Sequence, residues 1–110
     1  RVPFTAFVGV NTLFAALLDA PGFRALDFST LRFTAGGGSA VLRPVAERWH
    51  ELTGKPIIEG YGLTEASGVL TANPLDIVQH TGTIGYPLPS TECEIRDDDG
   101  RVVPAGTPKP

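Results

Sequence analysis

The stretch of residues 57–67 constrains the fold most, because its character changes from strand-like to glycine-rich within a few positions. It opens with two isoleucines, and β-branched apolar residues favour a buried strand. Gly60 and Gly62 then flank Tyr61, and a threonine and a glutamate follow. Glycine permits backbone angles closed to other residues and lets a ligand approach the backbone closely. The stretch therefore predicts a buried strand that leads into a ligand-binding turn.

Thr64 and Glu65 are residue types that bind a phosphate group and a hard cation. Mg²⁺ is typically held by one or two carboxylates together with substrate phosphates, so one threonine and one glutamate suffice when a nucleotide supplies the other oxygens. Structural alternatives stay open for each residue. Tyr61 is also compatible with an ordinary strand end, Thr64 with a helix cap, and Glu65 with a solvated carboxylate favoured by a helix dipole.

Strand-like segments recur along the first part of the chain. Short apolar runs at residues 6–10, 31–35 and 57–58 are typical of buried strands, and residues 69–71 form a fourth candidate. Segments with helical spacing separate the first three, which implies parallel strands joined by right-handed crossovers. We therefore expect the α/β fold class: a partial doubly wound parallel sheet with flanking helices, followed by the start of a small antiparallel β subdomain.

Two helices are expected between these strands. The first follows Asn11, a good N-cap residue, and ends before Pro21. The second begins at Ala40 or at Pro44, because proline suits the first helical position but disfavours helix in the residue before it. Gly54 is expected to end this helix as a left-handed cap.

The pattern changes near residue 80, which predicts two parts, residues 1–80 as the α/β segment and residues 81–110 as the start of the β subdomain. In the second part, residues 92–96 alternate in polarity as a strand does. Asp99-Gly100 is a strong hairpin-turn signal, and residues 101–103 are expected to form the second strand of that hairpin. A calcium loop is excluded there, because the position that needs a glutamate is occupied by proline.

Composition excludes several classes of protein. The chain has 110 residues, about one modest domain, and its net charge of −3 without a Lys/Arg cluster argues against a nucleic-acid partner. No apolar run approaches the roughly 20 residues that span a bilayer. The single cysteine, Cys93, has no internal disulfide partner, and a half-buried strand position is expected for it. Neither His50 nor His80 has a second histidine or cysteine at metal-binding spacing.

Three consecutive glycines, Gly36, Gly37 and Gly38, lie between the second strand and the second helix. Their backbone can press against a nucleobase or an acyl group, and a tight strand-to-helix turn is the structural alternative. They match neither phosphate-loop pattern, because no Gly-Lys-Ser/Thr follows and Val41 stands where G-x-G-x-x-G has its last glycine.

Residues 61–65, Tyr-Gly-Leu-Thr-Glu, resemble the signature of the adenylate-forming enzymes: acyl-CoA synthetases, luciferases and peptide-synthetase adenylation domains. With its flanks, the chain is most similar to bacterial long-chain fatty acid–CoA ligases. The likeness runs in order along nearly the whole chain, and it includes residues 9–14, 36–38, 46–49 and 82–87.

The resemblance implies a reaction in which a fatty acid is coupled to ATP, pyrophosphate is released, and the acyl group passes from AMP to coenzyme A. It implies catalytic roles for Thr64 and Glu65, with Glu65 also the Mg²⁺ ligand. The residues that the resemblance implies for nucleotide binding are Gly36, Gly37, Gly38, Glu59, Gly60, Tyr61, Gly62 and Thr64. Tyr61 is expected to stack on adenine.

This chain departs from the family pattern, because the Ser/Thr/Gly-rich phosphate loop, the ribose-binding aspartate, the hinge and the catalytic lysine are not in it. We therefore expect a middle segment of an N-terminal domain that is inactive alone and self-associates. The resemblance implies a cytoplasmic parent, with peripheral contact at the inner membrane face. Two other functions stay open: an adenylate-forming enzyme for another carboxylic acid, and a non-catalytic nucleotide-binding module.

Overall fold

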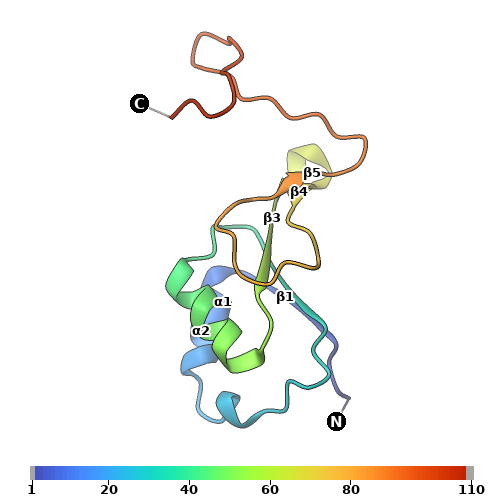
Figure 1. Ribbon diagram of the computed structural model, residues 1–110, viewed down its shortest axis with the longest axis vertical. Coiled ribbons are helices and arrows are strands. Elements are labelled where there is room, and N and C mark those ends of the chain that lie inside the picture. Colours follow the sequence, from blue (N-terminus) through green and yellow to red (C-terminus); the bar gives the residue numbers. More distant parts are fainter. Residues whose placement is uncertain (1, 109–110) are drawn as a thin grey trace.

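The computed structural model describes residues 2–108 as a five-stranded sheet with two α-helices and two short 3₁₀ helices (Figure 1). The strands are β1 (Ala6–Gly9), β2 (Phe33–Gly36), β3 (Ile57–Leu63), β4 (Gly68–Ala72) and β5 (Tyr86–Pro87). The helices are α1 (Asn11–Asp19), η1 (Phe23–Ala25), α2 (Arg43–Thr53) and η2 (Thr64–Ala66). Residue 1 of the first predicted part and residues 109–110 of the second lie outside the described residues.

The sheet is mixed, with its strands in sequence order. β1, β2 and β3 are parallel, whereas β4 is antiparallel to β3 and β5 is antiparallel to β4. The α/β fold class is therefore confirmed, and the fourth candidate strand, at residues 69–71, is present as the antiparallel β4. Only the short turn η2 separates β3 from β4, and a parallel neighbour would need a crossover of a dozen or more residues.

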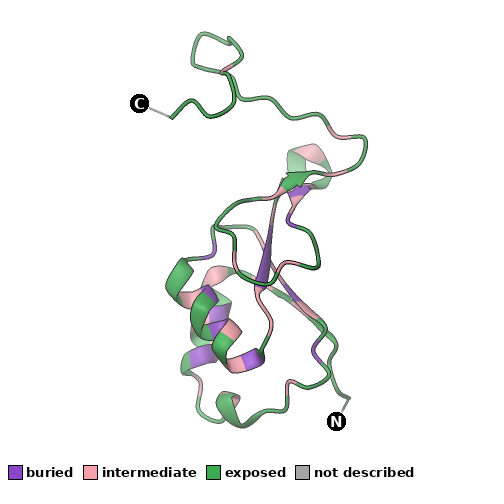
Figure 2. Ribbon diagram, in the orientation of Figure 1, coloured by how far each residue is buried: buried purple, intermediate pink, exposed green. Residues whose placement is uncertain are grey.

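Both α-helices contribute to one hydrophobic core against the sheet, as Figure 2 shows by the burial of their inner sides. Trp49 is its centre: its ring lies 4.8 Å from Phe14 and 5.6 Å from both Phe7 and Phe23, measured between centroids. The indole N–H donates to the Thr34 hydroxyl over 3.2 Å, so the polar atom of this buried ring is paired. The buried core residues are Phe14, Leu18, Val41, Ala46, Trp49 and Ile57.

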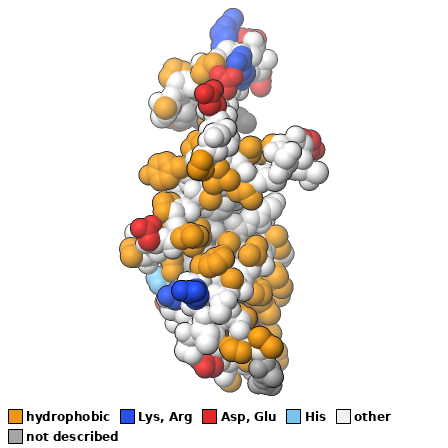
Figure 3. Space-filling view, turned by 90° about the vertical axis from the view of Figure 1, so that its right-hand side faces the viewer, with side chains coloured by type: hydrophobic (Ala, Val, Ile, Leu, Met, Phe, Trp, Pro, Cys, Tyr) orange, Lys and Arg blue, Asp and Glu red, His pale blue; other side chains and the backbone are white. Residues whose placement is uncertain are grey.

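Strand alternation sends other side chains to the sheet face away from this core. Val8 follows Phe7 on β1 and is 70% exposed, and Val69 on β4 is also exposed. Figure 3 shows hydrophobic side chains gathered on one side of the molecule. In residues 2–108 both α-helices pack into the single core described above, so a second helical layer is not among the described elements.

The helix ends differ in part from the prediction. Val10 is the N-cap of α1, and the Asn11 side chain instead accepts a hydrogen bond from the Leu42 N–H over 2.9 Å. The prediction that Asn11 is the N-cap is therefore wrong. Its side chain instead connects the start of α1 to the start of α2. The second helix begins at Arg43, next to the later of the two predicted starts, and Gly54 is its left-handed cap with φ 73°.

Residues beyond β5 extend away from the sheet as an arm (Figure 1). The predicted turn is present, with the Gly100 N–H donating to the Asp97 carbonyl over 2.9 Å and one bridge between Arg96 and Val102. Cys93 is exposed, so its half-buried position is a wrong prediction, because residues 92–96 have no sheet to pack on in the described part. The division at residue 80 stays a prediction. No helix among the described residues is long and apolar enough to cross a membrane.

Candidate functional site

Two pockets open where β2 and β3 end, and they share a glycine-rich wall. The smaller has a volume of about 290 Å³ and lies between residues 38–40, residues 59–62 and residues 82–84. The larger, about 500 Å³, lies over the sheet and is lined on its apolar side by Val8, Ala35, Ile58, Leu63 and Val69. Tyr61 borders both pockets and is 46% exposed, so one ring can serve both.

The three glycines after β2 have separate roles. A Cβ on Gly36 would lie 2.7 Å from Val41 Cγ2 and 2.9 Å from Ile57 Cγ2, so this glycine is required by core packing. Gly38 has φ +75°, where glycine is favoured over residues with a side chain. Gly37 is the least restricted, because a Cβ there would lie 3.5 Å from the Gly60 carbonyl oxygen. Gly37 thus lies beside Gly60 in the wall of the larger pocket.

The glycines beside Tyr61 are required by the sheet. A Cβ on Gly60 would lie 3.0 Å from the Thr71 carbonyl oxygen, and one on Gly62 would overlap the backbone of Gly68. The pairing of β3 with β4 also shifts register between Tyr61 and Gly62. Sequence reasoning assigned these glycines to permissive backbone angles and ligand approach, and it missed the close crossing of β4.

Thr64 and Glu65 begin η2, directly after β3. Thr64 lines the larger pocket, and its side chain makes no capping hydrogen bond. Glu65 is exposed, and its carboxylate has no hydrogen bond or ion pair within residues 2–108. The described residues contain no group of three or more His, Cys, Asp or Glu that could hold a metal by themselves. A lone free carboxylate fits a Mg²⁺ ion whose other ligands are phosphate oxygens and water.

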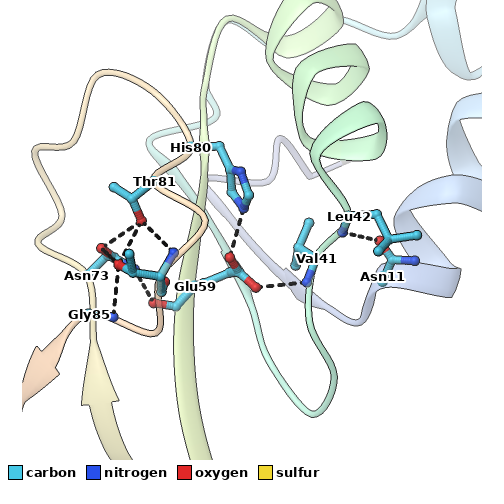
Figure 4. Close-up of polar contacts among 9 residues, drawn as sticks. Asn11, Val41, Leu42, Glu59, Asn73, His80, Thr81 and Gly85 are labelled. Carbon is cyan, nitrogen blue, oxygen red and sulfur yellow. Dashed lines mark hydrogen bonds and ion pairs between the residues drawn. The ribbon is translucent and has the colours of Figure 1, made fainter. Parts of the chain in front are cut away.

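Glu59 differs from the other predicted nucleotide-binding residues, because its carboxylate is buried and fully occupied by the protein (Figure 4). Oε1 accepts the Val41 N–H over 2.8 Å, and Oε2 lies 2.8 Å from His80 Nε2. The Glu59 backbone still borders both pockets. Sequence reasoning considered His80 only as a metal ligand, and its separation from Glu59 by 21 positions left no local signal of the pair.

Asn73 fastens the loop of residues 81–83 to the same strand (Figure 4). Its side-chain amide donates to the Glu59 carbonyl over 3.1 Å and to the Thr83 carbonyl over 2.6 Å. Its Oδ1 accepts the Thr81 hydroxyl over 3.0 Å. Asn73 is buried, and no sequence motif singles it out.

The fold and these pockets define a class: an α/β protein with a small-molecule site at the carboxyl ends of parallel strands, the usual position of ligands in such sheets. The sequence assigns the chain to one family within this class. Residues 1–108 match the family described as AMP-binding enzyme, and the chain belongs to that family.

Curated relatives and solved structures agree with this membership. The chain is 56% identical over 108 residues to a long-chain-fatty-acid–CoA ligase of Yersinia pestis, covering 98% of this chain and 19% of the relative. It is 55% identical over 108 residues to the ligase of the same description from Escherichia coli O6:H1, with the same coverage of 98% and 19%. The crystal structure of an anthranilate CoA ligase in complex with anthranoyl-AMP superposes with a TM-score of 0.87 and 35% identity, over 97% of this chain and 20% of that one. The chain thus spans about a fifth of the length of these proteins.

Proposed function

We propose that this chain is the part of an ATP-dependent long-chain fatty acid–CoA ligase that holds the nucleotide against the acyl group. The observation that carries the proposal is Tyr61, half-exposed between a small pocket with glycine-rich walls and a larger apolar one. The 56% identity to a long-chain-fatty-acid–CoA ligase supports the substrate class. Adenylation needs both substrates at one point, and the shared wall of the pockets supplies such a point.

The nucleotide belongs in the pocket of about 290 Å³. Its walls include the backbone after β2, the backbone beside Tyr61 and the loop of residues 82–84, which carry few side chains that would exclude a flat ring. Adenine stacked on Tyr61 would gain about 1–3 kcal/mol, the usual value for a base on an aromatic ring. Gly38, Gly60 and Gly62 then offer backbone groups to the base.

The acyl group belongs in the larger pocket, because its lining side chains are apolar. An acyl chain lying over Val8, Leu63 and Val69 would remove these exposed side chains from water, worth about 25 cal/mol per Å² of apolar area. Thr64 also lines this pocket, so the fatty acid carboxylate can face the nucleotide phosphates there.

Thr64 and Glu65 would serve the phosphates. The fatty acid carboxylate and the α-phosphate are both anions, so their approach requires compensating positive charge and oriented donors. The Thr64 hydroxyl can donate to a phosphate oxygen, and the unpaired Glu65 carboxylate can hold Mg²⁺. When bound, the ion offsets the negative charge of the phosphates.

Transfer to coenzyme A follows from the relatives, and no residue of this chain is assigned to it. Because long-chain acids partition into membranes, we place the parent enzyme in the cytoplasm with peripheral contact at the inner face of the membrane.

Fatty-acid-dependent exchange of pyrophosphate into ATP tests the proposal, in the full-length protein that carries this segment. Long-chain fatty acids are compared with anthranilate, benzoate and malonate at saturating ATP and Mg²⁺. We expect exchange with long-chain acids. Exchange with an aryl acid alone would favour the second candidate, a ligase for another acid, which the likeness to the anthranilate CoA ligase supports. ATP binding without exchange for any acid would instead indicate a non-catalytic nucleotide-binding module.

A further inference from the structure

The small pocket is built from three segments far apart in the chain: residues 38–40 after β2, residues 59–62 on β3, and residues 82–84 before β5. A pocket of this kind keeps its shape only if the three segments are fastened together. The carboxylate of Glu59 touches both of the other two, through residues directly beside the pocket walls.

One carboxylate oxygen holds the first loop. Glu59 Oε1 accepts the backbone N–H of Val41, the residue that follows the wall at Ala40, over 2.8 Å. The other oxygen holds the second loop: Oε2 lies 2.8 Å from Nε2 of His80, two residues before the wall at Gly82. Figure 4 shows the carboxylate between the two partners.

Burial makes this arrangement sensitive to the loss of either partner. The side chains of Glu59 and His80 are 8% and 7% exposed, and a buried carboxylate is costly unless donors satisfy it. An ionised Glu59 can only accept, so in that state Nε2 of His80 donates the hydrogen bond. His80 Nδ1 is buried and has no partner in residues 2–108, so Glu59 is the one polar anchor of this ring there.

We propose that Glu59 and His80 are positioning residues for the nucleotide: together they hold the two loops at the distance that ATP requires, without touching ATP. The inference rests on the proposed function, since it assigns the small pocket to the nucleotide. The bond from His80 holds the start of the loop that leads to residues 82–84, which Asn73 also holds through Thr81 and Thr83. The bond to Val41 fastens residues 38–40. Loss of the His80 bond therefore lowers the fraction of protein with a competent pocket, which weakens ATP binding in proportion.

Steady-state kinetics of the full-length enzyme separate positioning from stability. His80→Ala removes the donor, His80→Gln keeps an amide N–H that can reach Glu59 Oε2, and His50→Ala is the matched control. His50 is the other histidine of the chain and lies on α2, with no side-chain contact to Glu59. We expect His80→Ala to raise the KM for ATP about tenfold, with kcat and the KM for fatty acid nearly unchanged. His80→Gln should recover most of that loss, and His50→Ala should match the wild type.

Amide hydrogen exchange supplies a readout that does not need turnover. His80→Ala should speed exchange in residues 80–84, and Glu59→Ala should speed it in residues 38–42 as well. An unchanged KM for ATP in His80→Ala, or equal losses in kcat and both KM values without recovery in His80→Gln, would overturn the positioning role. If the wild type binds no ATP, the proposed function itself fails, and the nucleotide role falls with it. Normal turnover with unchanged exchange in both variants overturns only the loop-holding role.

Discussion

In the proposed function, the chemistry of this segment depends most on Glu65. It is an exposed carboxylate directly after Thr64 in η2, with no partner among the described residues that would explain it structurally. A charged group held in reserve for a ligand and a charged group that is merely solvated look alike in a free protein. Substitution separates them, because only the first changes catalysis.

Glu65→Gln in the full-length enzyme should damage adenylation and leave folding nearly intact. Glutamine keeps the shape and removes the charge that holds Mg²⁺, and loss of one well-placed electrostatic group typically costs about 10²–10³ in rate. An exposed side chain usually contributes within about 0.5 kcal/mol to the free energy of unfolding, so the melting temperature should hardly move. The measurement is ATP–pyrophosphate exchange across a Mg²⁺ titration.

Glu47→Gln is the matched control for that experiment, since Glu47 is an exposed carboxylate on α2 outside both pockets of the site. It should leave exchange unchanged at every Mg²⁺ concentration. If Glu65→Gln also exchanges at the wild-type rate when Mg²⁺ is scarce, Glu65 is a solvated first-turn residue. A parallel fall in exchange and melting temperature would make it structural.

Asn73→Asp should destabilise the protein strongly, although it changes only one atom type. The Asn73 amide donates to the carbonyls of Glu59 and Thr83, and an aspartate would face both carbonyl oxygens with a carboxylate. The Glu59 carbonyl keeps the Asn73 backbone N–H, whereas the Thr83 carbonyl loses its side-chain donor. We expect a loss of roughly 1–3 kcal/mol in the free energy of unfolding, the usual cost of an unsatisfied buried polar group. Urea denaturation of the full-length protein measures it.

Asn11→Asp is the control for this prediction, because Asn11 uses only its oxygen, as acceptor of the Leu42 N–H, and aspartate keeps that acceptor. Its stability should stay within about 0.5 kcal/mol of the wild type. Equal urea-denaturation midpoints for Asn73→Asp and Asn11→Asp would show that the Asn73 amide N–H groups do not stabilise the protein.

At the scale of elements, the sequence predicted what local patterns encode. The first three strands and both helices follow from apolar periodicity, and Gly54 follows from the need for a left-handed helix cap. The direction of β4 follows from a signal that the strand patterns do not carry: only residues 64–67 connect it to β3, too few for a parallel crossover. The Glu59–His80 pair was missed because it joins a strand to a distant loop, and neither residue's neighbours record the contact.

Alanine substitutions at Gly62 and Gly37 should differ in their effect on stability, because the neighbouring backbone leaves room for a Cβ at Gly37 but not at Gly62. Gly62→Ala would force a Cβ into the backbone of Gly68, so β3 and β4 must separate; overpacking of this kind costs about 1–3 kcal/mol or more. Gly37→Ala meets the Gly60 carbonyl at ordinary contact distance, 3.5 Å, and should fold normally. Its methyl group narrows the larger pocket, so it should raise the KM for fatty acid.

Thermal unfolding and substrate titration of the two full-length variants measure these effects. A melting temperature for Gly62→Ala equal to that of the wild type would mean that the β4 backbone near Gly68 can move away from β3 at little cost in stability. An unchanged KM for fatty acid in Gly37→Ala would show that the acyl group does not contact the wall of the larger pocket at Gly37.

The whole molecule is more extended than its length requires. Its radius of gyration is 16.2 Å, whereas a compact chain of this length has about 13 Å. The arm beyond β5 accounts for part of the excess, and the sheet leaves a broad apolar surface uncovered (Figures 1 and 3). The most exposed large apolar side chains over and beside the sheet include Val8, Val69, Leu75 and Val78.

The 110-residue chain by itself should self-associate, because this apolar surface and the edge strand β1 are both open to a second copy. Light scattering over a concentration series should show an average mass that rises well above 11.6 kDa. Val8→Lys places a charge on both the apolar face and the edge, so it should lower that mass. Ile95→Lys, an equally exposed site on the arm, should have little effect. A constant monomer mass for the unsubstituted chain would refute the prediction, and a larger effect of Ile95→Lys would assign the contact to the arm.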